Sequence, residues 1–340
     1  MSRAVSVVIP LLNEEPTLVE LHRQLREVER EQGYELQIVF VDDGSKDGSW
    51  ETVTKLANEH PLTEGVRFRR NFGKAAALMA GFESATAPIV VTMDADLQDD
   101  PRELPKLIGR LDGEGDLPEC DVVSGWKTDR QDPWHKRWPS LCFNTLVSRL
   151  TGVQLHDHNC GLKAYRREAL DEVRLYGELH RFVPVLAASR GYRVAEVSVH
   201  HRAREHGVSK YGASRILKGL LDLITVKFLT GYGERPQHAL GAVGLLSFLA
   251  GAAGLSYLAT RWVISRTAPG LEPLHLHDTA ALYYSLAFCL VGSQFLSVSL
   301  LGAMISSLVS RDSVSYSVAE YTAAAPTATA AERATPREAS

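Results

Sequence analysis

The stretch VVTMDADLQDDP, residues 90–101, starts inside an apolar run, continues through four aspartates and closes on a proline. The apolar residues over 89–93 predict a short buried strand. The proline predicts the first turn of a helix over 101–111, because its fixed backbone angle suits that position. The stretch therefore predicts a strand, an acidic turn and a helix in succession.

The same alternation of strands and helices extends on both sides of this stretch. Apolar runs predict further strands at 5–9, 36–41, 65–68 and 121–124, and helical spacing predicts helices at 14–31, 49–57 and 74–85. Such alternation predicts an α/β fold with a mostly parallel sheet and helices on both faces. In these sheets, ligands bind beyond the carboxyl ends of the strands. Polar clusters follow three of the predicted strands, at 11–14, 42–45 and 94–96.

The acidic turn has the donor atoms of a divalent-cation site. Asp94 and Asp96 flank one small residue just after the strand, so an extended turn points both carboxylates to the same side. Hard carboxylate oxygens suit Mg²⁺ or Mn²⁺, and Gln98 offers a further oxygen. The alternative is an acidic flank for the following helix, which fits Asp99 and Asp100 better. We expect the first two aspartates to bind the cation and the last two to open the helix.

The second acidic cluster follows the strand at 36–41. Asp42 there suits hydrogen bonds from a nucleoside base or ribose, and the alternative is a turn closed by an Asp side chain beside Gly44. The chain contains neither GxGxxG nor a Walker sequence. We therefore expect a bound diphosphate to rely on the cation and on basic side chains.

The composition separates a polar part of the chain from an apolar one. A net charge of −4 over 340 residues argues against a dedicated nucleic-acid binder, and four scattered cysteines argue against a disulfide framework. Residues 239–260 and 279–310 contain no charged residue, and each run is long enough to span a membrane. The alternative, a pair of buried helices in a soluble core, is disfavoured by the length of both runs.

Basic residues set the expected orientation of these two spans. Several lysines and arginines precede the first span and Arg311 follows the second, whereas the segment between them carries only Arg261 and Arg266. This bias predicts a multi-pass protein of the cell membrane with the N-terminal α/β domain and both termini in the cytoplasm. The expected organisation is an α/β domain at 1–211, an amphipathic juxtamembrane segment at 212–236, a two-helix transmembrane hairpin at 237–310 and a disordered tail at 311–340.

Six segments in order resemble one enzyme family. They are VVIPLLNEE, FVDDGSKDGS, RRNFGKAAALMAGF, VVTMDADLQDDP, DHNCGLKAYRREAL and REHGVSKYG. They are similar to the polyprenyl-phosphate glycosyltransferases, inverting enzymes of the GT-A fold in glycosyltransferase family 2 that include the dolichol-phosphate mannose synthase group. The resemblance covers residues 5–211, and the hairpin resembles the membrane portion of many members. It implies transfer of a hexose from a UDP- or GDP-linked sugar to a polyprenyl phosphate; the sugar, nucleotide, polyprenol and oligomeric state stay open.

The resemblance also implies roles for individual residues. Asp94, Asp96 and Gln98 would hold the metal and the diphosphate, and Asp96 would serve catalysis through it. The nucleotide-sugar side would be formed by Pro10, Asn13, Glu14, Asp42, Arg70 and Lys74. The acceptor phosphate would be bound by Arg204, Ser209 and Lys210, for which a plain juxtamembrane basic patch is the alternative.

The implied mechanism is one displacement with inversion. The lipid phosphate, largely a dianion near neutral pH, is itself the nucleophile. Arg204 and Lys210 would position it, and Asp157 would orient the acceptor or else serve only as a turn residue.

Three rival functions remain on the sequence alone. A processive polysaccharide synthase would carry Q-x-x-R-W, which is absent here. A non-catalytic membrane scaffold would not need the acidic and basic residues Asp42, Asp94, Asp96 and Lys210, all of which are present. A soluble nucleotidyltransferase would not need the hairpin.

Overall fold

The computed structural model describes residues 2–113, 117–128, 134–173, 175, 177, 179–202, 222–223, 225–226, 236–267 and 274–309. For 134–140, 142, 236–239, 303 and 305–309 only the backbone is described. Arg204, Ser209 and Lys210 therefore lie outside the described residues, as do the tail and most of the juxtamembrane segment.

A seven-stranded sheet in the order β3-β2-β1-β4-β6-β5-β7 forms the centre of the described residues. Its strands are β1 (Arg3–Leu11), β2 (Tyr34–Asp42), β3 (Thr63–Arg67), β4 (Ile89–Thr92), β5 (Val122–Lys127), β6 (Lys163–Arg166) and β7 (Val194–Val199). Only β6 runs antiparallel, to both β4 and β5, and the other four pairings are parallel. The carboxyl ends of six strands and the amino end of β6 therefore meet at one edge of the sheet.

Successive residues of β1 divide between the two faces of the sheet. Val7 is buried in one apolar core and Val8 in the other, as expected from strand alternation. The first core receives the apolar faces of α1 (Glu15–Gln32), α2 (Ser49–Glu59) and α4 (Leu104–Leu111), the last of which follows the 3₁₀ turn η1 (Pro101–Glu103). Both faces of the sheet are covered, which explains why β1 and β2 read as continuous apolar runs.

The second core lies under a different set of helices. They are α3 (Lys74–Ser84), α5 (Trp134–Thr151), α6 (Arg167–Asp171) and α7 (Val183–Ser189), with the 3₁₀ turn η2 (Leu179–Phe182) before α7. The largest side chain buried there is Tyr165 of β6, which packs edge-on against Phe82 of α3. Leu223 and Val226 are also buried in this core, so this part of the predicted juxtamembrane segment packs on the catalytic domain.

The predicted fold class is confirmed, with two additions at the distal side of the sheet. The strands and helices predicted up to residue 124 are all present. The antiparallel β6 and the edge strand β7 were not expected. β6 has only four residues, too few to show a period, and its place between β4 and β5 is set by pairing on both sides.

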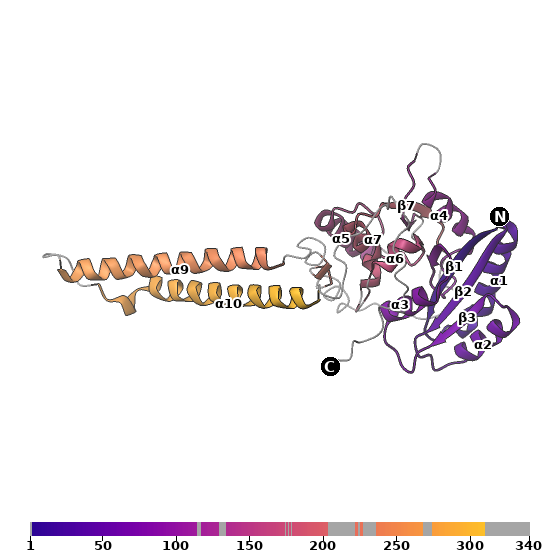
Figure 1. Ribbon diagram of the computed structural model, residues 1–340, viewed down its shortest axis with the longest axis horizontal. Coiled ribbons are helices and arrows are strands. Elements are labelled where there is room, and N and C mark those ends of the chain that lie inside the picture. Colours follow the sequence, from indigo (N-terminus) through magenta and orange to yellow (C-terminus); the bar gives the residue numbers. More distant parts are fainter. Residues whose placement is uncertain are drawn as a thin grey trace, which may run out of the picture.

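The two predicted spans are helices packed on each other: α9 (Pro236–Thr267) and α10 (Ala280–Val309), the latter after the turn η3 (Leu276–Asp278). Figure 1 shows the pair side by side and extending away from the sheet. Long apolar stretches, Leu240–Thr267 and Ala280–Gly302, are long enough to cross a membrane and are mostly exposed. The uncharged run ends at residue 260, but α9 continues through Arg261 and ends at Thr267, seven residues further on.

Glycines set the close approach of these helices. A Cβ on Gly292 would lie 2.4 Å from the backbone nitrogen of Phe248, and a Cβ on Gly251 would lie 2.6 Å from that of Cys289. Ser247 Oγ donates to the carbonyl of Phe288 at 3.0 Å, which adds a polar contact across the pair. Small residues that bring helix backbones together are typical of packing in lipid.

Candidate active site at the carboxyl edge of the sheet

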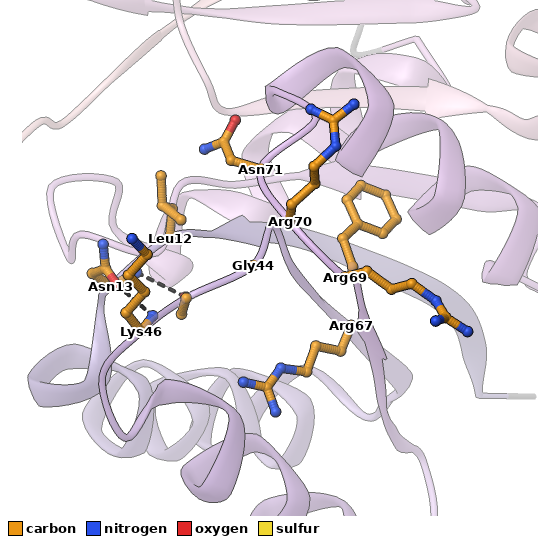
Figure 2. Close-up of a pocket in the computed structure, with 10 residues that line it drawn as sticks. Leu12, Asn13, Gly44, Lys46, Arg67, Arg69, Arg70 and Asn71 are labelled. Atoms are coloured by element: carbon orange, nitrogen blue, oxygen red, sulfur yellow. Dashed lines mark hydrogen bonds between the residues drawn. The ribbon is translucent and has the colours of Figure 1, made fainter.

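A cavity of about 920 Å³ opens where β1, β2 and β3 end. Its lining is formed by Leu12, Asn13, Gly44, Ser45, Lys46, Arg67, Phe68, Arg69, Arg70 and Asn71. Figure 2 shows Asn13 and Lys46 on one side of Gly44 and the three arginines on the other. Four of these ten residues are cationic and none is acidic, so the cavity suits an anionic ligand.

Asn13 joins the loops after β1 and β2. Its backbone N–H donates to Ser45 Oγ at 2.9 Å, and its Oδ1 accepts from the Lys46 N–H at 2.8 Å. Its φ of 57° lies in the left-handed region, which asparagine tolerates better than most residues. Asn13 is therefore placed at the predicted nucleotide edge, with its side chain engaged in the protein.

Gly44 lets the third loop approach. Its φ is 78°, and a Cβ there would lie 2.6 Å from the carbonyl carbon of Arg70. The backbone at Arg70 thus passes directly against the turn after β2. The Arg70 guanidinium lies over the Phe72 ring, 4.3 Å from its centroid, which brings this predicted residue to the rim of the cavity.

The two aspartates after β2 have different structural tasks. Asp42 is fully buried; its Oδ1 accepts from the Ser45 N–H at 2.8 Å and its Oδ2 lies 3.4 Å from Arg67 Nε. The Asp-closed turn is therefore present, and contact of Asp42 with a base or ribose stays a prediction. Asp43 Oδ1 accepts from the Phe72 N–H at 2.6 Å, and its Oδ2 from the Gly73 N–H at 3.0 Å.

Pro10 and Glu14 flank the same edge. Pro10 lies in β1 two residues past Val8, which pairs with Thr92 at the end of β4. Its missing N–H faces the side where β4 has ended, so no ladder hydrogen bond is lost. The Glu14 N–H donates to Ser49 Oγ at 3.0 Å at the start of α2.

The acidic turn after β4 lies beside the cavity loops. Lys74, in the first turn of α3, forms an ion pair with Asp94. Gly161 lies against the same carboxyl group, where a Cβ would come within 2.7 Å of its Cγ and Oδ2. Asp96 Oδ1 accepts from the Gln98 N–H at 3.2 Å. Leu97 between them has φ of 61°, a strained value for leucine that sharpens the turn.

The prediction for Asp99 is wrong. Asp99 does not open the helix; it is 2% exposed and its Oδ1 lies 3.6 Å from Lys127 Nζ and 3.5 Å from His201 Nδ1. Asp100 does open the helix, because its Oδ1 accepts from the Arg102 N–H at 3.0 Å. Strand-like pairing with the segment after β7 turns Asp99 inward, which the local acidic pattern does not reveal.

Gln98 faces that same segment. The Arg202 N–H donates to the Gln98 carbonyl at 2.9 Å, and Gln98 Nε2 donates weakly to the Arg202 carbonyl at 3.5 Å. Its amide group is therefore turned toward Arg202, and a role as a metal ligand stays a prediction. The Arg202 guanidinium pairs with Asp100 at 2.6 Å.

Two lysines at this edge were missed by the sequence analysis. Lys127 ends β5, and Lys163 begins β6 and donates to the Cys160 carbonyl. Burial lowers the pKa of Lys163. Burial alone also lowers the pKa of Lys127, but the adjacent Asp99 carboxylate raises it above its ordinary value. The available signal was a lysine at the edge-facing end of a strand, in SGWK and GLKAY.

Asp157 is buried in a turn. Its Oδ1 accepts from the Asn159 N–H at 3.0 Å, and its own N–H donates to Glu196 Oε1 at 3.0 Å. Glu196 also binds His156, whose ring stacks on Trp126 with centroids 4.1 Å apart. The turn interpretation is thus supported, and orientation of an acceptor by Asp157 stays a prediction.

The order of this sheet and the helices on its two faces are those of the GT-A fold. Among solved structures, glucosyl-3-phosphoglycerate synthase from Mycobacterium tuberculosis in complex with UDP is similar, with a TM-score of 0.51 and 20% identity over 66% of this chain and 80% of that one. Its complex with Mn²⁺, UDP and glucosyl-3-phosphoglycerate gives 0.51 at 19% identity over 66% of this chain and 78% of that one. This likeness concerns the fold.

The sequence comparisons define the family. Residues 6–174 match the family described as Glycosyl transferase family 2. A dodecaprenyl-phosphate galacturonate synthase from Rhizobium johnstonii is 39% identical, over 72% of each chain. An undecaprenyl-phosphate 4-deoxy-4-formamido-L-arabinose transferase from Pseudomonas fluorescens is 36% identical over 90% of this chain and 85% of the relative.

The chain belongs to glycosyl transferase family 2 and is a glycosyltransferase. The predicted relationship to polyprenyl-phosphate glycosyltransferases is confirmed by the names of these relatives. The two apolar helices and the relatives together make it a membrane protein.

Proposed function

We propose that this enzyme transfers a sugar, with inversion, from a nucleotide-diphosphate sugar to a polyprenyl phosphate at the cytoplasmic face of the membrane. The observation that carries the proposal is the meeting of two features at one sheet edge. A cavity lined by four cationic residues lies next to a turn that carries Asp94 and Asp96. The cavity and the acidic turn together suit a diphosphate that is bound by basic side chains on one side and by a cation on the other.

The acidic turn fits a divalent cation. Asp94 and Asp96 supply hard oxygen donors, and the missing side chain of Gly161 leaves room directly beside the Asp94 carboxyl. A Mg²⁺ or Mn²⁺ ion bound there would neutralise charge that develops on the departing diphosphate. Lys74, already paired with Asp94, places an ammonium group at the same position and can hold a phosphate oxygen.

The cavity provides the nucleotide side. Arg67, Arg69, Arg70 and Lys46 give it positive charge. The buried Asp42 Oδ2 accepts no hydrogen bond among the described residues, although Arg67 Nε lies 3.4 Å from it. That oxygen offers an acceptor for a base or ribose once the Arg67 side chain shifts. UDP- and GDP-linked donors both satisfy this chemistry.

The acceptor side is proposed on residues that follow Arg202 in the sequence. Arg202 itself is hydrogen-bonded to Gln98 of the acidic turn. We propose Arg204, Ser209 and Lys210 as the acceptor-phosphate group, since cations fix a phosphate dianion without a separate general base. Asp157, buried near this edge, is proposed to orient the acceptor side through its turn.

The two helices would hold the acceptor lipid close to this edge. We propose that α9 and α10 cross the membrane as a hairpin with both termini in the cytoplasm, because basic residues gather on the side of the catalytic domain. Cysteine labelling of residue 270 from outside intact cells tests this orientation. Labelling of residue 320 from outside, and not of residue 270, would show the opposite orientation and refute this topology.

The test of function uses membranes that contain the full-length enzyme. They are given polyprenyl phosphate, Mn²⁺ or Mg²⁺, and a panel of radiolabelled UDP- and GDP-sugars, and lipid-linked sugar is extracted. We expect product with one donor and a loss of at least about a hundredfold in Asp96→Ala. Asp112→Asn is the matched control, because Asp112 pairs with Arg3 and Arg166 at the opposite edge of the sheet. Full transfer by Asp96→Ala, or no product with any donor, would refute the proposal.

A further inference from the structure

Three strand ends converge on the Asp99 carboxylate. It follows β4, Lys127 ends β5, and His201 follows β7. Asp99 Oδ1 lies 3.6 Å from Lys127 Nζ and 3.5 Å from His201 Nδ1, and the Asp99 side chain is 2% exposed. Both basic side chains face the same carboxylate oxygen, so this group is engaged inside the protein.

The second oxygen of the same carboxylate holds the acidic turn. Asp99 Oδ2 accepts from the backbone N–H of Asp94 at 3.3 Å. One side chain thus fixes the backbone of a proposed cation ligand and also binds a lysine that lies nearby.

Lys127 is held by the same carboxylate that binds the Asp94 backbone, and its side chain is 14% exposed. Asp94 already has one lysine partner, Lys74. Unlike charges in a poorly solvated site attract strongly, so a Lys127 released from Asp99 would be drawn toward the carboxylates of the acidic turn.

We propose that Asp99 is a positioning residue for the cation site: it retains Lys127 and fixes the Asp94 backbone, so that the acidic turn offers its carboxylates to a metal ion. This inference rests on the cation of the proposed function. Asp99 itself touches neither substrate nor metal in this scheme. Its contribution is to keep a second lysine from neutralising Asp94 and Asp96.

The test is a double-mutant cycle read out by Mn²⁺ binding. Purified full-length protein in detergent is titrated with Mn²⁺ alone, and free Mn²⁺ is followed by electron paramagnetic resonance. We expect Asp99→Asn, which keeps an oxygen acceptor for the Asp94 N–H but loses the charge, to weaken Mn²⁺ binding at least about tenfold. In Asp99→Asn/Lys127→Met, binding should return to within about threefold of the wild type, because the competing lysine is gone.

Comparing Lys127→Met with the double variant distinguishes a specific effect of Asp99→Asn from misfolding. Once Lys127 is absent, the additional Asp99→Asn change should alter Mn²⁺ affinity by less than about threefold. Asp121→Asn is the matched control and should bind as the wild type does. Asp121 accepts a backbone hydrogen bond from Arg193 at 2.7 Å at the opposite end of β5.

The outcomes separate this inference from the proposed function. Wild-type affinity in Asp99→Asn, or a loss that Lys127→Met does not restore, overturns the positioning role while the cation itself stands. Absence of Mn²⁺ binding in the wild type refutes the cation of the proposed function, and this inference with it.

Discussion

Asp43 accepts two backbone hydrogen bonds from the loop before α3, from the Phe72 N–H at 2.6 Å and from the Gly73 N–H at 3.0 Å. The end of β2 is thereby tied to the segment that carries Arg70 and Lys74. Asp43 therefore shapes the cavity without lining it, and it is the direct neighbour of the proposed nucleotide residue Asp42.

We predict that Asp43→Ala weakens nucleotide binding. Both hydrogen bonds are lost and the loop with Arg70 is no longer held, so we expect the dissociation constant for the nucleotide to rise about tenfold and stability to fall by about 1–2 kcal/mol. The loss of stability is modest because Phe72 is exposed and its N–H can bind water. Calorimetric titration with UDP and GDP measures the first effect. An unchanged affinity in a folded Asp43→Ala protein would show that the loop is held by other contacts.

Gly161→Ala should remove cation binding and activity together. Its Cβ would come within 2.7 Å of the Asp94 carboxyl, so that the carboxyl group must turn away. We expect Mn²⁺ affinity to fall at least about tenfold. The matched control is Gly109→Ala in α4, where nothing lies within 4 Å of the added carbon and alanine favours the helix by up to about 1 kcal/mol. If both variants bind Mn²⁺ as the wild type does, the space beside Asp94 has no role in the site.

Removal of Lys74 should have opposite effects on the two ligands. The ammonium paired with Asp94 competes with a metal ion but can also hold a phosphate of the donor. Lys74→Met is therefore expected to tighten Mn²⁺ binding without nucleotide by a few-fold and to lower transfer at least about tenfold. Lys55→Met, at an exposed position of α2, controls for loss of a lysine. Weaker Mn²⁺ binding in Lys74→Met would contradict this competition.

The sequence predicted the strands and turns at the edge of the sheet better than the contacts between side chains from different strands. Strands up to residue 124 and the acidic turn were predictable because apolar runs, Pro101 and the turn residues act within a few positions of one another. Asp99 was misassigned because its partners, Lys127 and His201, lie on strands that pair only in three dimensions. A local acidic pattern predicts a helix start for both Asp99 and Asp100, and only tertiary pairing separates them.

The cavity shows the same limit. Asn13 and Arg70 were predicted at this edge from a resemblance, and both lie there. The hydrogen bonds from Asp43 to the loop before α3 were not predicted, since the two donors lie about thirty positions away and are backbone groups that any residue could supply. The antiparallel β6, which brings Gly161 beside Asp94, was likewise invisible in a four-residue segment.

The stability of the catalytic domain should decline in acid through buried histidines. Burial lowers the pKa of His158 from 6.5 to about 4, and that of His22 likewise to about 4. Below pH 6.5 the unfolded chain binds protons that the folded chain refuses, so this stabilisation is present above pH 6.5 and is lost progressively between pH 6.5 and 4.

His158→Gln tests this prediction in thermal unfolding scans at several pH values. The variant should lose stability less steeply between pH 6.5 and 4. It should also be less stable at neutral pH, because the 3.0 Å hydrogen bond between Ser148 Oγ and the His158 ring is lost. His200→Gln, at an exposed position, should show the wild-type slope. An unchanged slope in His158→Gln would assign the acid loss to other groups.

The packing of α9 on α10 should depend on a glycine and not on apolar character. A Cβ added to Gly292 would lie 2.4 Å from the backbone nitrogen of Phe248, so a side chain there would collide with α9. A Cβ added to Gly302 on the same helix would have nothing within 4 Å. Gly292→Leu should therefore lower the midpoint of thermal unfolding in detergent by several degrees, and Gly302→Leu should not. Both variants should remain in membranes after alkaline washing, because each span is still long and apolar enough. Equal midpoints for the two variants would show that close approach at Gly292 contributes nothing to the hairpin.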